Sequence, residues 1–218
     1  MTANNGKFPD TGRTAAGAAR RQQLIDATIE SIAKHSFAGT TLDTLTKEAN
    51  LSHGIVNFYF KSKEALFAET LGFLAQEHYD HWHTAMTKAG PDPSKQLVAI
   101  VETDFKSNIC SLNKLAVWFA FWALAKHRPA YLEVSNRTDE QRSIELERLC
   151  GEIVEDGGYD HIDPASATRI IESMIDGLWL NMLLYPNTFR RTEARDNIFA
   201  YLGELFPHHF ARLPAASD

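Results

Sequence analysis

The chain of 218 residues contains only two cysteines, Cys110 and Cys150, and neither lies in a CxxC pair. This scarcity excludes a disulfide scaffold and a zinc site built from cysteine pairs, and it favours a reducing compartment. The longest apolar run, at 115–125, is much shorter than the roughly 20 residues that cross a bilayer. The first residues also lack the apolar stretch of a signal peptide. Together these absences predict a soluble, cytoplasmic protein.

The alternation of apolar and polar residues that marks a β-strand is missing too, whereas helical spacing of apolar residues recurs along the chain. The first predicted helix begins near Arg20 and closes at Gly39. Further helices are predicted at 41–49, 53–59, 62–86, 93–110, 113–127, 129–155, 163–185 and 190–206. The predicted fold is therefore all-α, without an internal repeat.

Sequence motifs for catalysis are absent as well. The chain has no GxSxG-like context for a nucleophile and no glycine-rich phosphate loop. His78 and His81 are three residues apart on one predicted helix, with Glu77 and Asp80 beside them, and such a pair can share a metal. No third and fourth ligands follow nearby, so a solvated or interdomain role is the preferred interpretation. The chain is predicted to have no enzymatic activity, metal or cofactor.

Charge is distributed unevenly along the chain, although the net charge of −6 by itself disfavours a nucleic-acid partner. Residues 1–63 carry eight Lys and Arg against five Asp and Glu, whereas residues 64–218 carry 14 against 23. A basic end on an acidic body is typical of a protein of which only one end meets phosphate. The alternative is chance clustering in a short segment.

The two short helices predicted at 41–49 and 53–59 are joined by a tight turn, which is the arrangement of a helix-turn-helix unit. Asn50 lies where the turn needs a left-handed residue, and asparagine tolerates that conformation. Thr40 and Asp43 resemble a capping box, and Ser52 is the expected N-cap of the second helix. Plain helical bundles also contain such hairpins, so the pattern alone leaves both possibilities open.

The second helix of this unit is predicted to lie in the DNA major groove. Ile55, Phe58 and Phe60 are expected to pack against the first helix, which leaves Asn57 on the groove side, where it can pair with adenine. Hydroxyl groups and cations around this helix are expected to contact phosphates. The predicted DNA contacts are Arg20, Arg21, Thr40, Thr41, Ser52, His53, Gly54, Val56, Asn57, Tyr59, Lys61 and Lys63.

Residues 40–67, TTLDTLTKEANLSHGIVNFYFKSKEALF, resemble the N-terminal signature of the TetR family of transcriptional regulators. The resemblance implies a homodimeric, ligand-responsive repressor that binds a double-stranded DNA operator with two half-sites. Lys63 matches the phosphate-binding lysine of the family. Asn50 replaces the usual turn glycine and Asn57 replaces a frequent tyrosine, so the phosphate contact of that tyrosine is assigned to Tyr59.

The helix predicted at 163–185 is apolar on two neighbouring faces, which is more than a one-sided surface helix needs. One face can cover the protein's own core while the other meets a second copy, together with the helix at 190–206. A purely internal helix is the alternative. The residues predicted at the dimer interface are Ile171, Met174, Ile175, Leu178, Met182, Ile198, Tyr201, Leu202 and Leu205.

Four aromatic residues crowd the apolar segment at 115–125, where Trp118 and Trp122 share one helix face. Such stripes are more often core than ligand cage. The motifs WFAFWA, IDGLWL and SHGIVNFYF resemble the choline-responsive BetI subgroup of the TetR family, which implies control of glycine betaine synthesis. Aromatic faces hold quaternary ammonium groups through cation–π contacts, and Glu102 and Asp104 are candidate counter-charges. The predicted ligand-binding residues are Glu102, Asp104, Phe105, Trp118, Trp122, Tyr131 and Trp179.

The predicted organisation is a disordered arm at 1–18, a DNA-binding domain at 19–66, a ligand-binding and dimerisation domain at 67–210, and a tail at 211–218. Another cationic or apolar small molecule is the alternative ligand. The alternative of a different class is a helical protein-interaction module, which explains the aromatic residues and the dimer face but not the basic N-terminal part.

Overall fold

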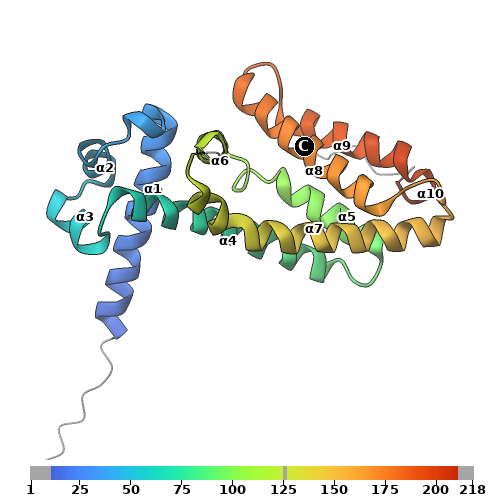
Figure 1. The fold of residues 1–218 in the computed structure, drawn as a ribbon, viewed down its shortest axis with the longest axis horizontal. Coiled ribbons are helices and arrows are strands. Elements are labelled where there is room, and N and C mark those ends of the chain that lie inside the picture. The colour runs from blue at the N-terminus through green and yellow to red at the C-terminus, as the bar shows by residue number, and fades with distance from the viewer. Residues whose placement is uncertain (1–10, 125–126, 211–218) are drawn as a thin grey trace, which may run out of the picture. The chain divides into compact units, whose positions relative to one another are not determined.

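The computed structural model describes residues 11–124 and 127–210 of the chain, and every regular element in these two ranges is a helix (Figure 1). The predicted all-α fold is therefore confirmed. The helices are α1 (Thr11–Gly39), α2 (Leu42–Ala49), α3 (His53–Tyr59), α4 (Lys63–Lys88), α5 (Pro93–Asp104), α6 (Leu112–Leu124), α7 (Pro129–Gly157), α8 (Pro164–Leu184), α9 (Arg191–Leu205) and α10 (Pro207–Phe210).

The chain forms two compact units, Met1–Thr70 and Leu71–Asp218, which we call the head and the body. The head contains α1, α2, α3 and the first residues of α4. Its core is a cluster of buried apolar side chains contributed by these four helices: Leu24, Ala27, Leu45, Ala49, Val56, Phe60 and Leu66. Because α2 contributes only two of these residues and α3 only Val56 and its C-cap Phe60, neither short helix buries enough apolar surface to be stable alone.

Helix α1 begins at Thr11, well before Arg20, where the apolar periodicity starts. Residues 11–18 of the arm predicted to be disordered are therefore helical. The reason is the sequence TAAGAA, in which alanine favours the helix without needing to be buried. Residues 1–10 of the predicted arm and the predicted tail at 211–218 lie outside the described residues.

The turn between α2 and α3 has the predicted left-handed residue, because Asn50 has φ 50° and ψ 47°. The capping box of α2 lies one position later than predicted. Thr41 is the N-cap, and its hydroxyl accepts from the Thr44 backbone N–H at 3.2 Å, while Thr44 Oγ1 accepts from the Thr41 N–H at 2.9 Å. Thr40 and Asp43 do not form the box, because the Thr40 hydroxyl points into the head and donates to the Ser36 carbonyl.

The body is a bundle in which α7 packs along α5 and α8, α8 packs on α6 and α9, and α10 closes against α9 (Figure 1). Helix α5 ends at Asp104 rather than at the predicted residue 110. The Asp104 carbonyl accepts a hydrogen bond of 2.9 Å from the Trp179 indole, so it is occupied by α8 instead of by the next helical turn. Helix α10 was not predicted from the sequence.

Cys110 and Cys150 are buried and unpaired, and burial raises the pKa of each thiol to about 11, as expected for inert core residues. Over the two described ranges, no helix is long and apolar enough to cross a membrane. The same residues contain no group of three or more His, Cys, Asp or Glu arranged to hold a metal ion.

Candidate functional site

Helix α3 is rotated relative to the prediction. Val56 keeps only 2% of its surface exposed and Phe60 only 4%, because both pack into the head core. Phe58, which was expected in that core, is 81% exposed. The predictions that Val56 faces the groove and that Phe58 packs on α1 are therefore wrong. Val56 and Phe60 are four residues apart and share one helix face, whereas Phe58 lies on the opposite side.

The exposed side of α3 carries four residues: His53, Gly54, Asn57 and Phe58. His53 Nε2 lies 2.9 Å from an Asp43 carboxylate oxygen, so the start of α3 is tied to α2. Asn57 is exposed on this side, as predicted. Together these residues present one amide, one imidazole and one aromatic ring within a helix of seven residues.

Some of the side chains predicted to contact phosphates already have partners within the head. Arg21 is ion-paired with Glu69 and stacks on the Phe60 ring at 4.9 Å, so it stabilises the head. Lys63 Nζ donates to the Thr40 carbonyl at 3.1 Å and is only partly exposed. Thr40 itself is fully buried, which contradicts its predicted phosphate contact.

The remaining predicted phosphate contacts lie at the surface of the head. Arg20, Thr41, Ser52 and Lys61 are exposed, and Tyr59 is half-buried against the head core. Arg20 donates to Gln23 at 2.6 Å, whereas Ser52 is the N-cap of α3 without a side-chain capping bond. These positions are available to a ligand of the head without disturbing its core.

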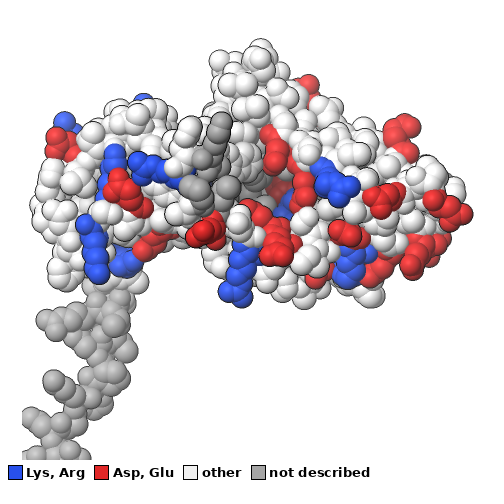
Figure 2. Space-filling model, viewed as in Figure 1, with Lys and Arg blue, Asp and Glu red and all other residues white. Residues whose placement is uncertain are grey.

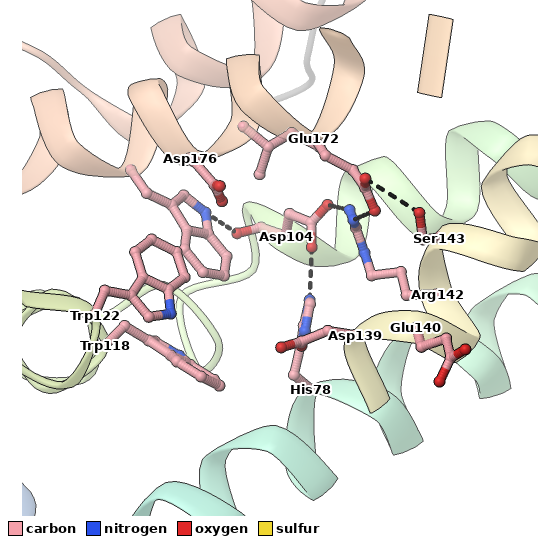
Figure 3. Close-up of a pocket in the computed structure, with 12 residues that line it drawn as sticks. His78, Asp104, Trp118, Trp122, Asp139, Glu140, Arg142, Ser143, Glu172 and Asp176 are labelled. Carbon is pink, nitrogen blue, oxygen red and sulfur yellow. Dashed lines mark hydrogen bonds and ion pairs between the residues drawn. The ribbon is translucent and has the colours of Figure 1, made fainter. Parts of the chain in front are cut away.

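The body contains a cavity of about 400 Å³ lined by side chains from α4, α5, α6, α7 and α8 (Figure 3). Trp118 and Trp122 come from α6 and Trp179 from α8, and the two α6 rings lie 6.1 Å apart. Trp118 and Trp179 are buried and Trp122 is half-buried. Figure 3 shows Trp118 and Trp122 on one side of the cavity and Arg142, Glu172 and Ser143 on the other.

A buried carboxylate, Asp104, organises the charged side of the cavity. It is fully buried, and its two oxygens meet His78 Nε2 at 2.6 Å and the Arg142 guanidinium at 2.6 Å. Arg142 also approaches Glu172 at 3.5 Å, and Ser143 donates to Glu172 at 3.3 Å. Burial alone raises the pKa of Asp104, but Arg142 and the hydrogen bond from His78 outweigh it and lower that pKa.

The other carboxylates around the cavity are less well compensated. Desolvation raises the pKa of Asp139, of Glu172 and, to about 6, of Asp176, and repulsion between neighbouring carboxylates adds to the shifts of Glu172 and Asp176. Five carboxylates line the cavity, counting Asp104, against one arginine. The cavity therefore combines aromatic faces with an excess of negative charge, which is a setting for a cation. Acidic side chains are also spread over the visible outer face of the body (Figure 2).

Four predicted ligand residues line this cavity, namely Asp104, Trp118, Trp122 and Trp179. Three do not. Glu102 is two residues from Asp104, hence on another face of α5, and pairs with Arg195 at 2.6 Å. Phe105 lies beside Glu102 in a separate surface hollow. Tyr131 is buried with its ring 4.9 Å from that of Phe121.

Most of the charged residues of the cavity were not predicted from the sequence. His78 was considered only as half of a metal pair, and Ile175 was assigned to the dimer interface. A signal for two of the others was present in the sequence: Glu172 and Asp176 are four residues apart on α8, on the face that also carries Trp179. The residues missed as cavity residues are His78, Asp139, Glu140, Arg142, Ser143, Glu172, Ile175 and Asp176.

Most residues predicted at the dimer interface face the interior of the body instead. Those that are buried within one subunit are Ile171, Ile175, Leu178, Met182, Ile198 and Leu202. Their assignment to a surface between subunits is wrong, because the same subunit already covers them. Met174, Tyr201 and Leu205 are half-buried. Helix α8 instead exposes another apolar row, with Ile170 47%, Leu180 39% and Leu184 57% exposed.

The sequence matches two family models. Residues 24–70 match the model for bacterial regulatory proteins of the tetR family, and residues 93–207 match the C-terminal domain of BetI-type transcriptional repressors. A curated relative, the HTH-type transcriptional regulator BetI of Stenotrophomonas maltophilia, is 31% identical over 183 residues, which cover 84% of this chain and 91% of the relative. The BetI regulator of Burkholderia lata is 31% identical over 74% of this chain and 80% of its own length.

Solved structures of transcriptional regulators share the fold. A regulator from Pseudomonas aeruginosa PAO1 superposes with a TM-score of 0.75 at 25% identity, covering 90% of this chain and 95% of that chain. A regulator from Saccharomonospora viridis, solved in complex with choline, superposes with a TM-score of 0.75 at 16% identity and covers 85% of this chain and 96% of that chain. These families and relatives are transcriptional regulators and not enzymes.

Proposed function

Because the chain belongs to the TetR family and carries the C-terminal domain of BetI-type transcriptional repressors, we propose that the effector it senses is choline or a closely related quaternary amine. The proposed target is an operator that controls glycine betaine synthesis from choline, in keeping with the BetI name of the relatives. The repressor is proposed to leave this operator when the amine binds the cavity in the body.

The observation that carries the proposal is the composition of the cavity. A quaternary ammonium group donates no hydrogen bond, so it is held by aromatic faces and by negative charge. Each cation–π contact contributes roughly 0.5–2 kcal/mol, more when water is excluded. Trp118, Trp122 and Trp179 supply the faces, and Asp176 with its neighbours supplies the charge. The fold shared with the choline-bound regulator of Saccharomonospora viridis supports the same ligand class.

The head is proposed to read the operator through the exposed side of α3. Asn57 is the candidate for pairing with adenine, while Lys61, Lys63 and the Thr41 end of α2 are candidates for phosphates. TetR-family regulators bind their operators as dimers. We assign the dimer contact to the exposed apolar row of α8 that includes Ile170 and Leu184, because these side chains are not covered within one subunit.

Helix α4 is the proposed route of communication. It is one continuous helix that carries Lys63, bonded to the Thr40 carbonyl of the head, and His78, bonded to Asp104 in the cavity. A ligand that rearranges the carboxylates also acts on His78, and therefore on α4. Ligand and operator then weaken one another by the same factor, typically with about 1–3 kcal/mol of coupling.

The test is fluorescence anisotropy of the purified protein on a duplex from upstream of its own gene, at fixed salt, with and without millimolar choline. Release by choline but not by equal sodium chloride is expected. A second ligand, 3,3-dimethyl-1-butanol, has the shape of choline with carbon in place of the charged nitrogen. It is expected to release nothing, because it keeps the apolar contacts and loses the attraction to the carboxylates.

A matched pair of variants separates an aromatic cage from a merely apolar pocket. Trp122 is half-buried, so its replacement is tolerated more easily than that of the buried Trp118. Trp122→Phe keeps an aromatic face and should retain most of the choline response, whereas Trp122→Leu keeps apolar volume and should lose about tenfold in affinity. If the protein binds the operator tightly and choline does not release it, the repressor function is retained and choline is excluded as the ligand. Another cationic or apolar effector is then favoured.

A further inference from the structure

Phe58 is the most exposed of the large apolar side chains in the described residues, at 81%. Among the described residues its ring contacts that of the neighbouring Tyr59, edge to face with the ring centres 5.1 Å apart. A phenylalanine this exposed buries almost no apolar surface, so it contributes little to the stability of the head. The head core is completed by Val56 and Phe60 without it.

The surroundings of Phe58 on α3 are also unusual for a packing role. Gly54 lies one helical turn earlier on the same side, and a Cβ built there would meet only Ser52 Oγ at 3.9 Å. Contacts inside the head therefore do not demand a glycine at this position. A side-chain-free position one turn before an exposed ring leaves room for another molecule to approach that ring closely.

The chemistry of the ring selects its partner. Residues 51–63 contain Lys61 and Lys63 and no Asp or Glu, so nothing acidic in this segment repels a phosphate backbone. Phenylalanine has no hydrogen-bonding group, and the one apolar group that bases present in the major groove is the 5-methyl group of thymine. Resting on the proposed function, we infer that Phe58 packs on a thymine methyl group in each operator half-site and so determines sequence specificity there.

The experiment removes that methyl group and nothing else. A binding duplex is first selected by the full-length protein from a randomised double-stranded library. Each thymine of one half-site is then replaced in turn by deoxyuridine, which keeps every hydrogen-bonding group of the base. Anisotropy at fixed salt should show one position at which affinity falls about fourfold, the effect of one buried methyl group.

The variant Phe58→Ala connects the effect to the side chain. It should bind the thymine duplex more weakly and lose nothing further with deoxyuridine at that position. Asn57→Ala is the matched control from the same exposed face: it should bind more weakly but keep the fourfold step. Since both residues are exposed, both variants should melt at the wild-type temperature by circular dichroism.

Two results would overturn the inference while leaving the repressor intact. One is a wild-type protein whose affinity is unchanged by deoxyuridine at every position. The other is a fourfold step that persists in Phe58→Ala, because another residue then contacts the methyl group. If the protein selects no duplex from the library, the proposed operator binding is wrong, and the inference about Phe58 is wrong with it. This outcome differs from the two results above, in which a duplex is selected and bound.

Discussion

Replacing Asp176 by asparagine should weaken choline binding in a pH-dependent way. Desolvation and the nearby carboxylates of Asp104, Glu172 and Asp139 raise the pKa of Asp176 to about 6, while Arg142 opposes the shift. Choline carries a permanent charge that does not titrate. Any change in its affinity near pH 6 must therefore come from the protein, and the substitution removes one titrating group without a large change in shape.

The sign follows from which form of Asp176 the cation prefers. A bound cation stabilises the carboxylate, so protonation competes with binding, and affinity should rise as pH increases through about 6. At a separation of about 4 Å, two unit charges interact by roughly 1 kcal/mol in water and roughly 4 kcal/mol at an effective dielectric constant of about 20. Asp176 is an exposed residue although its carboxylate is partly desolvated, so the lower figure is a minimum, which corresponds to about fivefold in affinity.

The assay is isothermal titration of choline into the protein at pH 5.0 and 7.5 in buffers of matched ionic strength. Wild-type protein should bind choline about fivefold more tightly at pH 7.5 than at pH 5.0. Asp176→Asn should bind choline at both pH values with the weaker affinity that wild type has at pH 5.0. The exposed Asp160 lies outside the cavity, so Asp160→Asn should behave as wild type. An equal pH dependence in wild type and Asp176→Asn would refute the reasoning, since another titrating group would then be responsible.

Three other outcomes are expected. Arg142→Met leaves a buried carboxylate without its cation and should cost roughly 3–5 kcal/mol in urea unfolding, whereas the exposed Arg148→Met should cost less than about 1 kcal/mol. Equal losses of unfolding free energy in the two variants would show that the buried pair of Arg142 and Asp104 does not stabilise the body. Leu184→Lys should make the protein monomeric by sedimentation while Ile144→Lys, also on an exposed side chain, leaves the dimer; dimers in both cases would place the interface elsewhere. Lys63→Ala should weaken binding to all duplexes and reduce the salt slope by about one; a loss confined to the operator would contradict a phosphate contact.

The sequence predicted the helices of the head well but not the orientation of α3. The periodicity, Asn50 and Ser52 located the helix-turn-helix, since these signals depend on local backbone preferences. The helix has two turns and apolar residues on both sides, so periodicity cannot decide whether Val56 or Phe58 faces inward. The orientation of α3 is determined by its packing against α1 and α2, which the sequence does not show.

A similar ambiguity affected the body. Helix α8 is apolar on several faces, and the sequence alone could not identify the row that its own subunit covers. The cavity was predicted through its tryptophans, because WFAFWA and IDGLWL are visible as motifs. Of its charged side only Asp104 was predicted, because His78, Arg142 and Glu172 come from three helices that are far apart in sequence. Only the packing of these helices brings them together.

The carboxylates of the cavity divide into two groups with different consequences. Asp104 is paired and its pKa is lowered, so its charge is compensated within the protein. The raised pKa values of Glu172 and Asp176 mean that folding disfavours their ionised forms. Uncharged residues at these two positions would give a more stable fold. A cation in the cavity relieves this penalty without displacing Arg142 from Asp104. Stability should therefore depend mainly on Asp104, and affinity for the proposed ligand mainly on Asp176 and Glu172, so that this ligand could bind and leave while the core ion pair stays intact.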